Sequence, residues 1–242
     1  MEIRCENIFK RFGKNEVLKD ISLEIEEGKI TMIIGGSGVG KSLLLKHFCG
    51  LVRPNSGRIF LDSQDITKLS ERALYPIRRR MGVIFQSGGL LASMNVGENV
   101  ALGLKEHRLA PIEKINDVVK EKLSLVELEG KEDVMPANLS GGMRKRVSIA
   151  RALTMNPEII LYDEPTAGLD PPMSENIDKL IMDLNQKMNV TSVVVTHDLI
   201  SIFKLAHYIY MLHDGRIIFS GTPEQLRSSE NSEVKEFISR QY

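Results

Sequence analysis

Mostly apolar runs, without the regular alternation of polar residues, recur along the chain and predict strands that are buried on both faces. Residues 30–34, 159–162 and 192–195 are runs of this kind, and strands covered on both faces are typical of parallel sheets. Residues 21–25 instead alternate between apolar and polar side chains, which predicts a half-exposed strand. The pattern therefore favours a sheet with a buried parallel centre.

Segments with helical periodicity lie between these runs. They cover residues 43–51, 112–128, 140–155 and 173–188, and the alternation of strand and helix predicts an α/β fold. Residues from about 95 to 138 contain helical segments and no comparable buried strand, which indicates a helical lobe inserted into the α/β core.

The tail after Gly221 also carries helix signals. Residues 222–225 read Thr-Pro-Glu-Gln, a helix start. Residues 232–240 place Val234, Phe237 and Ile238 on one helical face, so we expect this segment to pack on the core.

A glycine-rich stretch follows the apolar run 30–34 directly. It matches the phosphate-binding loop pattern and reads Gly35, Gly36, Ser37, Gly38, Val39, Gly40, Lys41 and Ser42. The glycines permit backbone conformations that aim successive N–H groups at phosphates. Lys41 can reach the β- and γ-phosphate oxygens, and Ser42 can bind Mg²⁺. The order of strand, loop and helix therefore predicts a nucleotide-binding protein.

Two adjacent carboxylates, Asp163 and Glu164, follow the apolar run 159–162. The carboxyl end of a parallel strand is where such sheets present ligand-binding groups. Asp163 can hold Mg²⁺, and Glu164 can activate the water that attacks the γ-phosphate. We expect both residues to face the phosphate loop.

The composition of the chain limits its partners and its location. The chain has 242 residues, and Lys plus Arg and Asp plus Glu both number 32, so no net charge points to a nucleic-acid partner. The two cysteines match no zinc or disulfide pattern, and the N-terminus lacks the apolar region of a signal peptide. No apolar stretch approaches the ~20 residues that span a bilayer. We expect a cytosolic chain whose membrane role, if any, requires a partner.

A second glycine-containing helix start occurs at Ser140, Gly141, Gly142 and Met143. It predicts another anion-binding helix N-terminus. One nucleotide does not need two such sites in one chain, so the second would face the nucleotide of another subunit. With the phosphate loop, this segment resembles the signature sequence of the ATP-binding cassette (ABC) superfamily, and the resemblance runs along nearly the whole chain.

The resemblance implies a fold and cofactors. It implies a P-loop NTPase of the α/β class, an ABC nucleotide-binding domain with an inserted helical subdomain and a small antiparallel β subdomain. One domain would cover residues 1–242, with residues 1–86 and 156–242 as the catalytic core and about 87–155 as the helical subdomain carrying the signature. Two subunits would form a homodimer around two ATP molecules with Mg²⁺.

The resemblance also implies roles for isolated residues. Gln86 would sense the γ-phosphate and contribute to the Mg²⁺ site, and His197 would contact the γ-phosphate as a switch. Asp170 would organise the dimer seam. Phe12 aligns with the aromatic residue that stacks on adenine, although Phe9 lies close enough in sequence to compete for this role.

Two positions depart from the superfamily pattern. Met143 replaces the usual Gln of the signature, and Ala167 replaces a common Ser. Neither change removes a catalytic group, because the signature's anion site is built from backbone. The thioether of Met143 donates no hydrogen bond, so the change can alter signalling across the dimer.

The segment after Gln86, residues 80–96, resembles the ATPase subunits of Mla-type phospholipid transporters, which work with MCE-domain proteins in Gram-negative envelopes. The signature's Met supports this resemblance, as do residues 74–75, 78–80, 99–101 and 106–107. It implies membrane permease subunits, an MCE-domain protein and a small regulatory subunit as partners. The chain would then lie on the cytoplasmic face of the inner membrane.

Two alternatives stay open at this point. One is the ATPase of an importer for polar amino acids or another small solute, which would have a solute-binding protein among its partners. The other is a soluble ABC assembly factor of the iron–sulfur type, which would show no membrane association. A translation or DNA-repair ABC protein is disfavoured, because the chain carries neither a second cassette nor a long inserted coiled coil.

Overall fold

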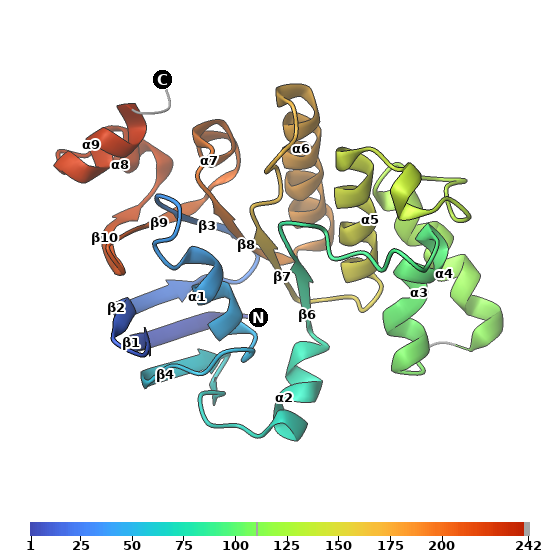
Figure 1. Cartoon of the computed structure of the whole chain (residues 1–242), viewed down its shortest axis with the longest axis horizontal. Helices are drawn as coiled ribbons and strands as arrows, with labels where there is room; N and C mark the ends of the chain where they lie inside the picture. Colours follow the sequence, from blue (N-terminus) through green and yellow to red (C-terminus); the bar gives the residue numbers. More distant parts are fainter. Residues whose placement is uncertain (110, 240–242) are drawn as a thin grey trace.

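The computed structural model describes residues 1–109 and 111–239, and a mixed sheet forms its centre (Figure 1). The strands are ordered β10 (Arg216–Gly221), β9 (Tyr208–His213), β3 (Ile30–Ile34), β8 (Thr191–Thr196), β7 (Ile159–Asp163) and β6 (Met81–Ile84). All neighbours pair in parallel except β10, which is antiparallel to β9. Every residue of β3 and β8 is buried. The predicted parallel centre is therefore confirmed.

A smaller antiparallel sheet lies beside the centre. Its order is β2 (Asn15–Ile25), β1 (Ile3–Phe12), β4 (Ser56–Leu61) and β5 (Gln64–Asp65). Burial alternates strictly along residues 21–25 of β2, which confirms the predicted half-exposed strand. This sheet is the antiparallel β subdomain that the superfamily resemblance implies.

Helix α1 (Lys41–Phe48) packs between the two sheets. Its Leu44 and Phe48 share one apolar cluster with Ile8 of β1 and with Ile33 of β3. The other face of the central sheet packs against a second cluster, which contains Met32 of β3 and residues of several helices. Alternate side chains of β3 therefore serve two cores, and the loop between β3 and α1 is fixed at both ends.

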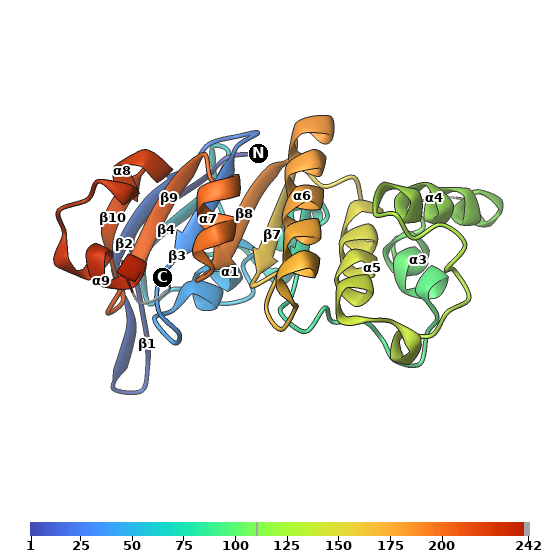
Figure 2. The ribbon, with the colours of Figure 1, turned by 90° about the horizontal axis from the view of Figure 1, so that it is seen from above.

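The helical lobe lies at the end of the molecule away from the antiparallel sheet (Figures 1 and 2). It contains α3 (Val96–Glu106), α4 (Ile112–Leu125), a 3₁₀ turn (Pro136–Asn138) and α5 (Gly141–Leu153). Buried Asn99 of α3 accepts a hydrogen bond from Leu91 N and donates to three backbone carbonyls of residues 91–95. The chain leading into the lobe is thereby pinned. The subdomain boundaries at 87 and 155 stay a prediction.

The remaining helices border the central sheet or end the chain. They are α2 (Glu71–Arg78), α6 (Pro171–Met188), α7 (Leu199–Leu205), α8 (Pro223–Arg227) and α9 (Ser232–Ser239). Val234 of α9 is fully buried, and Phe237 and Ile238 pack against the same core. The tail therefore packs as predicted up to Ser239, whereas Arg240 of the predicted segment lies outside the described residues. Within residues 1–109 and 111–239, no helix is both long and apolar enough to cross a membrane.

A buried carboxyl group, that of Asp178, joins α6 to α7. Asp178 is 2% exposed and accepts a hydrogen bond of 2.8 Å from Ser201 Oγ, which also contacts Asp198 at 3.1 Å. Burial raises the pKa of Asp178 from 3.8 to about 6; the hydrogen bond from Ser201 lowers it, and the nearby Asp198 carboxylate raises it. Lys204 lowers and Glu175 raises the same pKa.

The Asp178→Asn variant is expected to be more stable at pH 8, by roughly 2–3 kcal/mol. A carboxyl whose folded pKa is raised destabilises the fold fully above pH 6, and this cost fades as pH falls toward 3.8. The gain should therefore shrink to about half at pH 5. Urea unfolding at both pH values measures it, with Asp183→Asn of the same helix, whose side chain is 36% exposed, as control. An equal gain at both pH values would refute the assignment.

Candidate nucleotide site

The phosphate loop runs from the end of β3 into α1 and depends on its glycines. Gly35 has φ 142°, and a Cβ there would lie 2.2 Å from the carbonyl oxygen of Leu212. Gly40 caps α1 in the left-handed region, with φ 107°. Lys41 Nζ donates hydrogen bonds to Gly35 O (2.8 Å) and Gly36 O (2.9 Å). The ammonium group is thus held inside its own loop.

The two predicted catalytic residues, Glu164 and His197, converge with Lys41 beside this loop. Lys41 Nζ lies 3.8 Å from Glu164 Oε1, and His197 Nδ1 lies 3.0 and 3.1 Å from the two oxygens of that carboxylate. Burial lowers the pKa of Lys41, and the Glu164 and Asp163 carboxylates oppose this shift. Glu164 has φ 48°, and its N–H donates to Val195 O at 2.9 Å. The end of β8 therefore fixes the turn that presents the carboxylate.

Ser42 and Asp163 meet at the start of α1. The Ser42 hydroxyl donates a hydrogen bond of 2.6 Å to Asp163 Oδ1. A hydroxyl and a carboxylate oxygen at this spacing are the hard donors that Mg²⁺ prefers in nucleotide sites. Within the described residues, no group of three or more His, Cys, Asp or Glu forms a metal cluster. The donor set therefore fits a cation shared with phosphate oxygens and water.

Gln86 shares a hollow with Asp163. The hollow has a volume of about 490 Å³ and is lined by Lys46, Phe85, Gln86, Ser87, Asp163, Ala167 and Gly168. Gln86 follows β6, and Asp163 ends the neighbouring strand β7. Parallel pairing thus places the two residues at the same edge of the sheet, as their sequence positions predict.

The two candidate adenine contacts lie on the antiparallel sheet. Phe12 ends β1 with 55% of its surface exposed, and Lys10 Nζ lies 5.0 Å from its ring centroid. Phe9 is 39% exposed and lines a separate shallow pocket with Glu16 and Asn55. Phe12 is therefore free to stack, but it does not contact the cluster around Lys41.

The signature segment opens α5. The Ser140 side chain caps the helix by accepting from Met143 N at 3.2 Å. A Cβ at Gly141 would lie 3.0 Å from Leu169, and one at Gly142 would lie 3.5 Å from Met173. The segment therefore packs closely against the loop that carries Asp170.

Asp170 has a structural task within its own chain. Its carboxylate caps α6 by accepting a 2.8 Å hydrogen bond from Met173 N. The helix that starts at the signature, α5, and the phosphate-loop helix, α1, lie apart in both views of the ribbon (Figures 1 and 2). One copy of the chain therefore presents the two predicted anion-binding segments at separate places.

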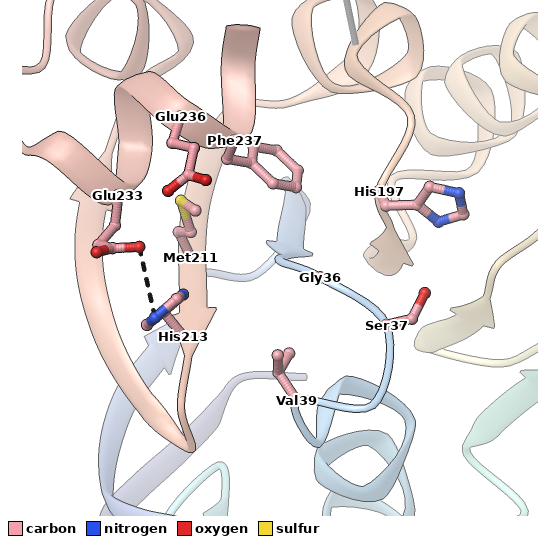
Figure 3. A pocket seen from close by; sticks show the side chains of 9 residues that line it. All are labelled: Gly36, Ser37, Val39, His197, Met211, His213, Glu233, Glu236 and Phe237. Atoms are coloured by element: carbon pink, nitrogen blue, oxygen red, sulfur yellow. Dashed lines mark ion pairs between the residues drawn. The ribbon is translucent and has the colours of Figure 1, made fainter. Parts of the chain in front are cut away.

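A cleft of about 340 Å³ separates the phosphate loop from the C-terminal helix (Figure 3). Its lining comprises Gly36, Ser37, Val39, His197, Met211, His213, Glu233, Glu236 and Phe237. His213 Nε2 lies 3.5 Å from Glu233 Oε2 across one wall. The tail of the chain thus borders the site, which the sequence reasoning did not predict.

Sequence reasoning also missed Lys145. It lies on α5, is 6% exposed, and donates hydrogen bonds to Gln86 O and to Glu164 O. Its sequence signal was weak, because a lysine inside a basic stretch usually lies on a solvated face. Its burial and its contacts with two predicted site segments make Lys145 part of the site instead of a solvated surface residue.

The glycine loop, the paired carboxylates and the capped signature helix agree with a known family. The model of the family described as "ABC transporter" matches residues 18–167. The chain belongs to the ABC transporter family. It is an ABC-type ATPase, and its fold is an ABC nucleotide-binding domain with antiparallel β and helical subdomains.

Named relatives of this ABC transporter ATPase cover almost its full length. It is 41% identical over 236 residues to the "Intermembrane phospholipid transport system ATP-binding protein MlaF" of Haemophilus influenzae, covering 98% of this chain and 89% of that protein. It is 40% identical over 236 residues to the "Probable ribonucleotide transport ATP-binding protein mkl" of Mycobacterium leprae, covering 98% and 68%. The two names differ in cargo, so they agree on a transport ATPase only.

A solved structure has the same fold. The ATP-binding cassette MJ0796, described as a dimer in a post-hydrolysis state bound to ADP and Pi, superposes with a TM-score of 0.83 at 35% identity. The match covers 91% of this chain and 98% of that chain. This ABC transporter ATPase therefore has the fold of a cassette whose structure was solved as a dimer with hydrolysis products.

Proposed function

We propose that two copies of the chain close around two ATP molecules and use their hydrolysis to drive a membrane permease. The phosphate loop of one copy would face the signature segment, Ser140 to Met143, of the other. Support comes from the separate positions of α1 and α5 in one copy and from the dimeric state of MJ0796. Asp170 would lie at the seam, where it also holds the start of α6.

The ATP phosphates would be bound by the loop amides of residues 35–40 and by Lys41. Ser42, Asp163 and Gln86 would hold Mg²⁺, which would neutralise charge on the phosphates. The support is the Ser42–Asp163 contact and the hollow that Asp163 shares with Gln86. Phe12 would stack on the adenine ring, and its exposed face supports this role.

Glu164 would act as general base. It would accept a proton from the water that attacks the γ-phosphorus, while the bond to the β-phosphate oxygen breaks and ADP and phosphate form. His197, within hydrogen-bond reach of the same carboxylate, would contact the γ-phosphate and orient Glu164. Closure would then require the triphosphate, because both anion sites engage the γ-phosphate.

The cargo that we propose is phospholipid. The observation that carries this assignment is the 41% identity with MlaF across 98% of this chain and 89% of that protein. The partners would be permease subunits, an MCE-domain protein and a small regulatory subunit, without nucleic acid. The chain would lie on the cytoplasmic face of the inner membrane, held by the permease.

A polar small solute is the second candidate cargo. The 40% identity with mkl, a protein named for ribonucleotide transport, favours it. The transporter relatives support both cargo classes over a soluble assembly factor. A solute-binding protein among the partners would distinguish this candidate from lipid transport.

Purification of the tagged chain from detergent-solubilised native membranes tests the proposal. Mass spectrometry of the co-purifying proteins and lipids should find a permease, an MCE-domain protein and phospholipid. A permease with a solute-binding protein would favour the second candidate. A purely soluble set of partners would contradict transport altogether.

A further inference from the structure

One face of α5 holds the backbone that follows β6. Lys145, Ser148 and Arg151 lie on successive turns of the helix, and each donates to carbonyl oxygens of residues 86–89. Ser148 Oγ lies 2.7 Å from Gly88 O, and Arg151 Nη1 lies 2.7 Å from Gly89 O. A Cβ at Gly88 would lie 2.9 Å from Ser148 Oγ. The segment therefore follows the helix that begins at the signature.

Lys145 differs from the other two residues because it reaches the catalytic turn as well. Its ammonium group donates to Gln86 O and, at 3.3 Å, to Glu164 O. The backbone of Glu164 is thus held on both sides. Lys145 donates to its carbonyl oxygen, and its N–H donates to Val195 O. Glu164 needs this support, since its φ of 48° is unfavourable for a residue with a side chain.

The Lys145 contacts also join the signature helix to the turn that carries Glu164. The side chain is 6% exposed, so its bonds are shielded from water and geometrically defined. Loss of the ammonium group would leave the Gln86 and Glu164 carbonyls without this donor. Any shift of α5 would then no longer be passed to the turn that presents the Glu164 carboxylate.

We propose that Lys145 is a positioning residue for hydrolysis, which fixes the Glu164 turn to the Gln86 segment and to the signature helix. It acts through the backbone carbonyls of Gln86 and Glu164. This inference rests on the roles proposed for Glu164 and Gln86, and is independent of the cargo. It makes the signature helix of a copy part of the support for that copy's own base.

Lys145→Met tests the inference, because it removes the ammonium group and keeps an unbranched apolar stem. In the full chain purified with its membrane partners, kcat for ATP hydrolysis should fall about tenfold or more, since a small misplacement of a base costs this much. KM for ATP should change less than about threefold, because the phosphate contacts remain. Lys145→Arg keeps a charged donor and should recover kcat to within about threefold of wild type.

Lys122→Met is the matched control. Lys122 is also 6% exposed and lies in the helical lobe, but its partners are Glu121 and Asn156, away from the site. This variant bears the same loss of a buried ammonium group and should keep kcat within about twofold. Thermal melting of both variants reports folding, and a merely structural role for Lys145 would lower stability without the kcat-specific loss and its rescue by Arg.

Contrary results are well defined. A folded Lys145→Met protein with kcat within twofold of wild type, or a loss no larger than that of Lys122→Met, would overturn the inference. If Lys145→Met does not fold, Lys145→Gln is measured in the same way: at least a threefold fall in kcat is expected, and wild-type kcat overturns it. Glu164→Gln is measured in parallel. Wild-type turnover in this variant would refute Glu164 as the general base, which separates a failure of that assignment from a failure of the Lys145 inference.

Discussion

Replacing Glu164 with glutamine is expected to lower ATP turnover by about 10² to 10⁴-fold, the usual cost of losing a general base. Glutamine keeps the size of the side chain but cannot accept the proton of the attacking water at neutral pH. ATP binding should persist, because Lys41 and the loop amides are untouched. The variant should therefore accumulate as an ATP-bound dimer, visible by size-exclusion chromatography with Mg²⁺ and ATP.

Glu175→Gln is the matched control for this experiment. Glu175 lies on α6, pairs with Lys204 and is 71% exposed at its side chain. Its substitution should leave turnover and the ATP-dependent dimer unchanged. Wild-type turnover in the Glu164→Gln variant would remove Glu164 from the mechanism.

Replacing Lys41 with methionine is expected to lower turnover by about 10² to 10³-fold, as losing one preorganised group at a site of developing charge typically does. The ammonium group is positioned in advance, since it is held by Gly35 O and Gly36 O and lies 3.8 Å from the Glu164 carboxylate. In contrast to the Glu164 variant, this one should also bind ATP weakly and form no ATP-dependent dimer. Equilibrium binding of a fluorescent ATP analogue measures the difference.

Lys187→Met controls for the loss of a lysine. Lys187 lies in the last turn of α6 with 71% of its side chain exposed, and its Nζ lies 3.5 Å from Asp183 Oδ2. Its substitution should change neither nucleotide binding nor turnover. Unaltered ATP affinity in the Lys41→Met protein would contradict the proposed phosphate site.

The central sheet and the phosphate loop were accessible from sequence because their causes are local. A run such as residues 30–34, apolar at every position except Thr31, is typical of a strand with both faces covered. Gly35 has a φ of 142°, a backbone conformation that favours glycine, so the glycine before Lys41 indicates the local course of the backbone. The sequence spacing also predicted the edge at which Asp163 meets Ser42, since parallel strands end together.

Other features could not be predicted, because they depend on contacts between distant segments. Lys145 appears in sequence as part of a basic stretch, and only the fold buries it against Gln86 and Glu164. The predicted helix at residues 112–128 ends at Leu125, because the next residues turn to bond back to the helix end. Asp170 was expected at a dimer seam, and its capping of α6 emerged from the geometry alone.

The transported molecule cannot be predicted from local sequence features. The groups around Lys41 would hydrolyse ATP in the same way for any transported molecule. Their geometry therefore does not identify what the permease carries. Residues 80–96, which follow α2 and lead into the helical lobe, are the segment from which the sequence analysis predicted a phospholipid-transport partner. The relatives named for phospholipid and for ribonucleotide transport are almost equally identical to this chain.

Lipid movement by the purified complex is the most direct test of lipid transport driven by this ATPase. The complex from native membranes would be reconstituted in vesicles with a fluorescent phospholipid, with either the wild-type chain or Glu164→Gln. We predict that phospholipid is transferred only with ATP and Mg²⁺, and that the Glu164→Gln complex transfers none beyond a single cycle. Normal ATP turnover without phospholipid transfer, or turnover stimulated only by a polar solute, would contradict the account.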